Sequence, residues 1–210
     1  MAFLVKVLLR DDDVGHVVMT IEHVNRKGKT YYLHQGKTKT GKPQFFFSMK
    51  SAGSLVDTIP EGYEIYENPN AQVFLRKIPP QIVMPTEVAT VRDGMQRHAK
   101  VKHYIIDVKG KNIVVYLCDQ NEDALMAITA MWPGSNTAKV SETLLRAMTY
   151  SPMMQFRLSD EKTRKFDVER WCFRGSVDDW VCLDRDRDLK ALVTKYTPHL
   201  GQDSFYELSP

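Results

Sequence analysis

Prolines at positions 79, 80 and 85 place the strongest constraint on how this chain folds. Proline has no backbone N–H and a fixed φ, so neither a helix interior nor a central strand runs through such a stretch. These prolines therefore predict a boundary between a β-rich portion, residues 19–80, and an α+β portion, residues 86–210. The sequence leaves open whether the two portions pack as one unit.

The β-rich portion has the pattern of antiparallel hairpins. The runs TYYLHQ (30–35) and QFFFSM (44–49) are rich in β-forming residues and flank the polar loop GKTKTGKP, which predicts a long-looped hairpin. The runs 62–67 and 71–77 flank Asn68-Pro69-Asn70, a strong turn triplet, and predict a second hairpin.

The C-terminal portion mixes helices with antiparallel strands. A helix is expected from Thr86, as its N-cap, to His98, followed by a hairpin of residues 102–108 and 112–118. Strands interspersed with helices in this way predict an α+β fold rather than a parallel βαβ fold. The other expected elements are a helix from Asn121, a helical stretch over 137–150, strands over 154–158, 165–173 and 179–183, and a helix over 186–196.

Composition excludes two broad classes of protein. Of the 210 residues, 43% are hydrophobic and 26% are charged, which is enough apolar material to form a core and excludes a disordered chain. No run approaches the roughly 18 apolar residues of a membrane span. The net charge of +3 is too small by itself to require a polyanionic partner.

The cysteines indicate neither a disulfide framework nor a zinc site. Cys118, Cys172 and Cys182 are odd in number and lack the close spacing of metal-ligating pairs. Each lies in an apolar run, where a free thiol packs as a small hydrophobe. A bridge between Cys172 and Cys182 across a hairpin is the less favoured alternative. Reduced thiols are the norm inside cells, which disfavours this bridge. Because the N-terminus lacks the features of a cleavable signal peptide, a cytoplasmic location is expected by default.

The first 18 residues differ in character from the rest of the chain. MAFLVKVLLR resembles the start of a signal peptide, but three aspartates follow it and no small-residue cleavage site is present. Met19 begins a plausible alternative start, MTIEHV. Residues 1–18 are therefore expected to be a tail or a mis-assigned upstream extension, which the intact mass of the native protein tests.

Two motif-like stretches lack the residues that their chemistry requires. Gly36–Lys42 matches the first seven positions of a phosphate-binding P-loop, but Pro43 replaces the magnesium-binding hydroxyl and a strand-like run follows. Asp184, Asp186 and Asp188 have the spacing that opens an EF-hand, but Leu189 and Lys195 replace the required Gly and Glu. An acid-rich helix start explains these aspartates better.

No catalytic or metal-binding constellation emerges from the remaining residues. The six histidines show no metalloprotease spacing, and no nucleophile elbow or reactive-cysteine signature is present. We therefore assign no metal and no cofactor, and we expect a non-enzymatic protein. A hydrolase or nuclease built from scattered Asp and His side chains is the weakest alternative.

Charge is concentrated in one segment of the chain. Between Ile21 and Lys50 there are seven Lys and Arg residues and a single acidic residue, Glu22. The net charge of this segment is therefore strongly positive, and the net charge of the remainder of the chain is negative. Basic loops beside exposed aromatic rings can follow a nucleic-acid backbone and stack on bases. The candidate polyanion-binding residues are Lys29, Lys37, Lys39, Lys42, Tyr31, Tyr32 and Phe46.

Two other interpretations remain open. The lysines could simply keep the hairpin tips in solvent and prevent exposed strand edges from pairing with another chain. The alternate aromatic residues would then belong to the hydrophobic core. The chain could also be a protein-interaction or regulatory module with an apolar surface that includes Trp171, Trp180 or the Met153-Met154 pair. The expected partners are therefore nucleic acid or a protein, and not a membrane.

Three stretches resemble a family of uncharacterised bacterial proteins. They are KTKTGKPQFFFS, IPEGYEIYENPNAQVFLRK and IDVKGKNIVVY, and the similarity extends over roughly residues 19–120. The resemblance implies a bacterial cytoplasmic setting and places residues 1–18 outside the shared part. No activity, cofactor or catalytic residue comes with it.

Overall fold

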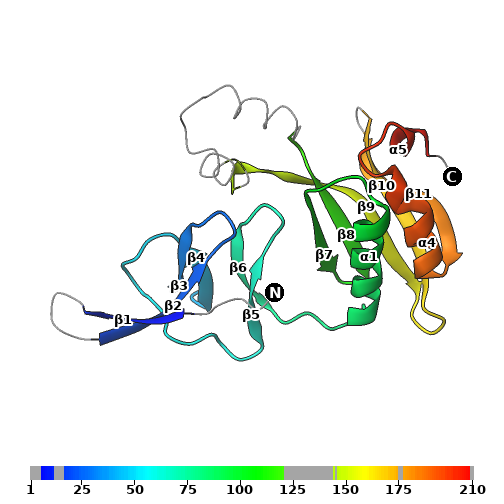
Figure 1. Ribbon diagram of the computed structural model, residues 1–210. Coiled ribbons are helices and arrows are strands. Elements are labelled where there is room, and N and C mark those ends of the chain that lie inside the picture. Colours follow the sequence, from blue (N-terminus) through cyan, green and yellow to red (C-terminus); the bar gives the residue numbers. More distant parts are fainter. Residues whose placement is uncertain (1–5, 12–16, 121–143, 145, 175–176, 209–210) are drawn as a thin grey trace, which may run out of the picture. The chain divides into compact units, whose positions relative to one another are not determined.

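The chain has an α+β fold, as its sequence predicts. A computed structural model describes residues 6–11, 17–120, 144, 146–174 and 177–208, and their strands form three antiparallel sheets (Figure 1). The chain divides into two compact units, one of residues 1–78 and 129–147 and the other of residues 79–128 and 148–210. Whether 19–80 and 86–210 are separate domains stays a prediction, as does the assignment of residues 1–18 to a tail.

The first unit contains a meander of neighbouring strands and a separate hairpin. The meander has the order β1 (Lys6–Asp11), β2 (Val17–Val24), β3 (Thr30–Lys37) and β4 (Pro43–Ser48). The expected hairpin around GKTKTGKP is confirmed, because β3 and β4 pair antiparallel. The hairpin around the Asn-Pro-Asn triplet is also confirmed and consists of β5 (Tyr63–Glu67) and β6 (Val73–Lys77).

Polar side chains make up much of the interior of the first unit. Ile21, Leu33 and Val73 are buried there, but so are four polar residues, which are Thr20, His23, Asn25 and His34. A buried polar group destabilises a fold unless a hydrogen bond satisfies it. The first unit therefore depends on specific polar contacts as well as on apolar burial.

The second unit is built on one larger antiparallel sheet. Its strand order is β11 (Val177–Arg187), β10 (Lys165–Arg174), β9 (Tyr150–Asp160), β8 (Asn112–Cys118) and β7 (Tyr104–Lys109). One face of this sheet packs against helices (Figure 1). These are α1 (Pro85–His98), α4 (Leu189–Tyr196), the short 3-10 turn η1 (Thr197–His199) and α5 (Ser204–Glu207). The fully buried side chains between sheet and helices include Ile113, Val115, Met154, Phe156, Phe166 and Leu192.

Both long helices begin differently from the sequence expectation. Thr86 is not the N-cap of α1, because the helix already starts at Pro85 and Met84 is the cap. Proline is pre-organised for the first helical position, where its missing N–H is not needed. Glu87, three residues after the cap, accepts a hydrogen bond from the Met84 N–H at 2.8 Å.

The aspartates before α4 do not all belong to a helix start. Asp184 and Asp186 lie in β11, and only Asp188 caps the helix, where its Oδ1 accepts the Ala191 N–H at 3.1 Å. The expected helical stretch over 137–150 is wrong at its end, because Tyr150 already belongs to β9. The rest of that stretch and the helix expected from Asn121 lie mostly outside the described residues.

The three cysteines are free thiols. Register explains why Cys172 and Cys182 do not meet: β10 and β11 place Cys172 opposite Asp179 and Cys182 opposite Glu169. Successive side chains of a strand point to opposite faces, so the two thiols lie on different faces of the sheet.

Among the described residues, no helix combines the length and apolar character that crossing a bilayer requires.

A glycine in the middle of α1 allows the two long helices to approach closely. A Cβ placed on Gly94 would lie 1.9 Å from Cγ1 of Val193 in α4. Glycine lowers helix propensity by about 1 kcal/mol relative to alanine. The close contact with α4 is the structural reason for a glycine here.

We expect Gly94→Ala to destabilise the protein by about 1–3 kcal/mol, because the added methyl group forces α1 away from α4. The measurement is the free energy of unfolding in urea. Gln96→Ala is the matched control, since Gln96 is exposed on the same helix and its substitution should change stability by less than about 0.5 kcal/mol. Helix propensity alone would make Gly94→Ala stabilising. A measured increase in stability for this variant would therefore contradict the packing argument.

Candidate functional site

The tip of the β3–β4 hairpin is a closed loop that hydrogen-bonds to itself. Thr38 donates its N–H to the Lys42 carbonyl at 2.8 Å, and its Oγ1 accepts the Lys42 N–H at 3.1 Å. Gly41 has φ 79°, a left-handed conformation that glycine adopts without strain. β4 starts directly at Pro43, so this glycine-lysine loop leads into a strand and not into the helix of a P-loop.

The lysines of this tip are exposed and carry unneutralised charge. Lys37, Lys39 and Lys42 are all exposed, and within the described residues none of them pairs with a carboxylate. Arginines of the same unit behave differently: Arg26 pairs with Glu67 and Arg76 with Glu64. The tip therefore concentrates positive charge that is available to an anionic partner.

The aromatic candidates differ in how much surface they present. Phe46 is 43% exposed, and its ring stacks on His34 with centroids 5.6 Å apart and planes at 13°. Gly36 leaves room for this ring, since a Cβ there would lie 3.2 Å from Cε1 of Phe46. Tyr31 is half-buried, and Tyr32 is only 7% exposed and belongs to the interior. Phe46 is the candidate ring with an open face.

The predicted residues fall into two groups at opposite ends of β3. Lys37 ends the strand, with Lys39 and Lys42 in the loop that follows. Lys29 lies in the turn before the strand, eight residues and about 26 Å along the chain from Lys37. The structure thus brings three lysines together at the tip but leaves Lys29 and Tyr31 at the other end.

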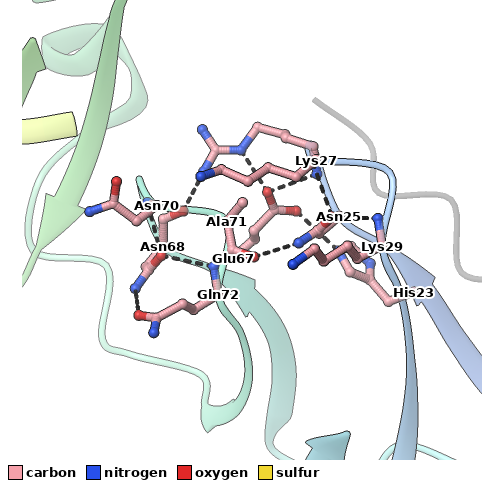
Figure 2. Close-up of polar contacts among 10 residues, drawn as sticks. His23, Asn25, Lys27, Lys29, Glu67, Asn68, Asn70, Ala71 and Gln72 are labelled. Carbon is pink, nitrogen blue, oxygen red and sulfur yellow. Dashed lines mark hydrogen bonds and ion pairs between the residues drawn. The ribbon is translucent and has the colours of Figure 1, made fainter. Parts of the chain in front are cut away.

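A polar cluster that the sequence pattern did not indicate lies beside that other end (Figure 2). Its centre is Glu67, whose side chain is 2% exposed. Glu67 Oε1 accepts the backbone N–H of Arg26 at 3.0 Å and the Arg26 Nε–H at 2.6 Å. The Nε2 of His23 lies 3.2 Å from the other carboxylate oxygen. The Arg26 guanidinium also donates to the Asn68 carbonyl.

Asn25 makes the second connection of this cluster. Its Oδ1 accepts the N–H groups of Lys27 at 3.0 Å and Lys29 at 2.8 Å, which closes the turn between β2 and β3. Its Nδ2 donates to the Ala71 carbonyl at 2.7 Å. Ala71 has φ 64°, unusual for a residue with a Cβ, and the bond from Asn25 holds it there.

Asn68 closes the turn that carries Ala71. Its Oδ1 accepts the N–H groups of Asn70 at 2.9 Å and Gln72 at 3.0 Å, and its Nδ2 donates to Gln72 Oε1 at 2.7 Å (Figure 2). Asparagine side chains commonly organise turns in this way. The turn residues were readable in the sequence, but their connection to residues 23–29, more than 40 positions earlier, was not.

The pKa of the Glu67 carboxyl lies below its ordinary value. Burial alone would raise the pKa of its carboxyl, but hydrogen bonds from His23 and Arg26 outweigh burial and hold that pKa below its ordinary value. Both carboxylate oxygens of Glu67 are engaged, and these contacts connect residues 23–26 to the β5–β6 hairpin. In the described part of the chain, no group of three or more His, Cys, Asp and Glu side chains could hold a metal ion.

Comparison with known proteins identifies no relative: no family model, no curated protein and no solved structure matches this chain. The resemblance to uncharacterised bacterial proteins stays a prediction.

We expect Glu67→Gln to destabilise the protein by about 2 kcal/mol, because the amide cannot accept all the hydrogen bonds that the carboxylate accepts. Urea unfolding measures this loss. Glu64→Gln is the control on the same strand, since Glu64 forms a more exposed ion pair with Arg76 and should contribute less than about 1 kcal/mol. An equal decrease in the free energy of unfolding in the two variants would mean that the buried contacts of Glu67 contribute no more stability than the exposed ion pair of Glu64.

The lowered pKa of Glu67 predicts a pH dependence of stability. A carboxyl whose pKa is lower in the folded state stabilises the fold above its unfolded pKa, and this contribution disappears as the pH falls through the folded pKa. The free energy of unfolding should therefore decrease as the pH is lowered from the ordinary carboxyl range, and Glu67→Gln should weaken that decrease. A variant with the same acid profile as the wild type contradicts this assignment.

Proposed function

We propose that this chain is a non-enzymatic binding protein whose β3–β4 hairpin contacts nucleic acid or another polyanion. The observation that carries the proposal is the cluster of three exposed lysines at the hairpin tip, Lys37, Lys39 and Lys42, with no carboxylate partner among the described residues. The loop's internal hydrogen bonds support it further, because they close the turn that places Lys39 and Lys42 at one end of the hairpin.

Counterion release is the physical basis of the proposed binding. Lysines that contact phosphates release the cations condensed on a nucleic acid, so affinity falls steeply as salt rises. Phe46 adds a ring that can stack on an unpaired base, which favours single-stranded over double-stranded partners. Lys29, at the far end of β3, contributes long-range attraction, and the buried Tyr32 supports the hairpin from within.

Binding to labelled nucleic acid tests the proposal. With three phosphate contacts to a single strand, the slope of log affinity against log salt is about −2, so affinity should fall about 15-fold between 50 and 200 mM salt. Replacing Lys37, Lys39 and Lys42 with Gln should abolish most of this slope. Fluorescence anisotropy with single- and double-stranded probes measures both quantities.

A matched triple variant separates position from total charge. Lys102, Lys162 and Lys190 are exposed lysines of the second unit, and their replacement with Gln removes the same charge elsewhere. This control should bind almost as the wild type does. Absence of binding at low salt, or equal losses in both triple variants, overturns the hairpin as the site.

A second pair of variants tests base stacking. Phe46→Ala should weaken single-strand binding by about 1–3 kcal/mol and leave double-strand binding nearly unchanged. Phe74→Ala is the control, because Phe74 is similarly exposed but lies in the β5–β6 hairpin. Equal effects of Phe46→Ala on both probes would remove stacking from the proposal and leave the lysines alone as contacts.

A further inference from the structure

Within the described residues, the end of strand β10 has a strand partner on one side only. It pairs with β11 as far as Arg174 opposite Val177, but with β9 only as far as Arg170 opposite Met154. Arg170 instead donates its Nε–H to the Leu208 carbonyl at 3.1 Å. The segment that follows α5 is therefore held beside this end of the strand.

A pocket of about 430 Å³ lies between this strand and this segment, within the second unit. Its lining consists of residues 170–173 of β10 and residues 206–208. Successive side chains of a strand point to opposite faces, so a pocket lined by four consecutive residues runs along the edge of the strand. Its volume lies in the range of about 300–1,000 Å³ that is typical of small-molecule sites.

Aromatic rings form most of the apolar wall of the pocket. Phe173 is 55% exposed and Tyr206 is 64% exposed. Trp171 packs edge-on against Trp180 with ring centroids 5.0 Å apart, and against Phe173 at 6.2 Å. Met154, by contrast, is fully buried in the core and belongs to no surface. The rings offer a ligand an apolar surface in which Trp171 is oriented by its aromatic neighbours.

Two charged residues of opposite sign line the same pocket. They are Arg170, which is half-buried, and Glu207, which is exposed. Within the described residues, neither forms an ion pair with the other or with any other side chain. A guanidinium has five N–H donors, and the hydrogen bond to the Leu208 carbonyl uses the Nε–H. The two terminal nitrogens are the donors that can hold a carboxylate through two parallel hydrogen bonds.

This lining favours a ligand that carries both charges and an apolar body. A half-buried cation without a carboxylate partner in the described chain favours an anionic group, because a charge withdrawn from water is stabilised by an opposite charge. The carboxylate of Glu207 favours a cationic group in the same ligand. The aromatic wall favours an apolar side chain. A free amino acid with an aromatic or a large aliphatic side chain has all three features.

We propose that this pocket binds a free apolar α-amino acid as its zwitterion. The ligand carboxylate accepts hydrogen bonds from Arg170, the ligand ammonium donates to Glu207, and the ligand side chain packs against the aromatic wall. The site lies in the second unit and uses no residue of the β3–β4 hairpin, so this proposal and the proposed polyanion binding can each fail alone.

Isothermal titration calorimetry of the full chain with L-phenylalanine and L-leucine tests the proposal. Ligands of this size should bind with dissociation constants of about 0.1–1 mM. Three analogues each lack one recognised group: 3-phenylpropionate lacks the ammonium, L-phenylalaninamide lacks the carboxylate, and glycine lacks the side chain. Each should bind about tenfold more weakly than L-phenylalanine, or less tightly still. Absence of binding for both amino acids, or an analogue that binds as tightly as L-phenylalanine, overturns the assignment.

Variants of the two charged residues assign the contacts. Glu207→Gln should weaken the binding of L-phenylalanine about tenfold and should not weaken that of 3-phenylpropionate, which has no ammonium. Arg170→Gln should weaken the binding of both ligands, since both carry a carboxylate. Because Arg170 also holds Leu208, the Glu207 variant is the decisive one. Ligand-observed NMR measures the weaker complexes.

Asp203→Asn is the matched control for Glu207→Gln. Asp203 is an exposed residue at the start of α5 whose side chain makes no capping hydrogen bond, and it does not line the pocket. This variant removes the same charge from the same segment and should bind L-phenylalanine as the wild type does. Equal losses in the two variants, or a Glu207→Gln variant that binds as the wild type does, overturn the contact with the ammonium and with it the zwitterionic ligand.

Discussion

The buried carboxylate of Glu67 is the interaction on which the first unit depends. Among its described residues the first unit buries few apolar side chains, and several of the buried groups are polar. Each buried polar group left without a partner costs about 1–3 kcal/mol, so the fold forms only if these groups find one another. Glu67 accepts hydrogen bonds from the backbone N–H and the side chain of Arg26. Asn25, in the same turn, donates a hydrogen bond to the Ala71 carbonyl.

The position of the basic hairpin follows from these contacts. Asn25 and Arg26 belong to the turn that leads into β3, and β3 carries the lysine tip at its far end. The acidic group at the base of the hairpin is neutralised by Arg26, whereas the cations at the tip have no such partner in the described chain. One hairpin thus has a paired, buried carboxylate at its base and, within the described residues, three lysines without a carboxylate partner at its tip.

The second unit is stabilised by apolar packing between its sheet and its helices. Its helices lie close to each other because Gly94 has no side chain, and its sheet buries a continuous layer of aliphatic and aromatic residues. Within the described residues, β10 pairs with β11 beyond the end of its pairing with β9.

Local chemistry explains which expectations from the sequence succeeded. Both hairpins of the first unit and the hairpin at 104–118 were predictable, because glycine, proline and asparagine define tight turns between β-forming runs. The start of α1 was missed by two residues, because Pro85 serves as the first helical residue rather than as a barrier. The aspartates near 186 were placed in a helix because the pattern does not separate a strand end from a helix cap.

The sequence alone determined the fold class, the hairpins and the segregation of charge, because these depend on residues only a few positions apart. Tertiary structure decided that Phe46 is exposed while Tyr32 is buried, that Glu67 meets Arg26, and that β10 extends beyond β9. Alternation along a strand puts neighbours on opposite faces, but only packing between distant segments decides which face is covered.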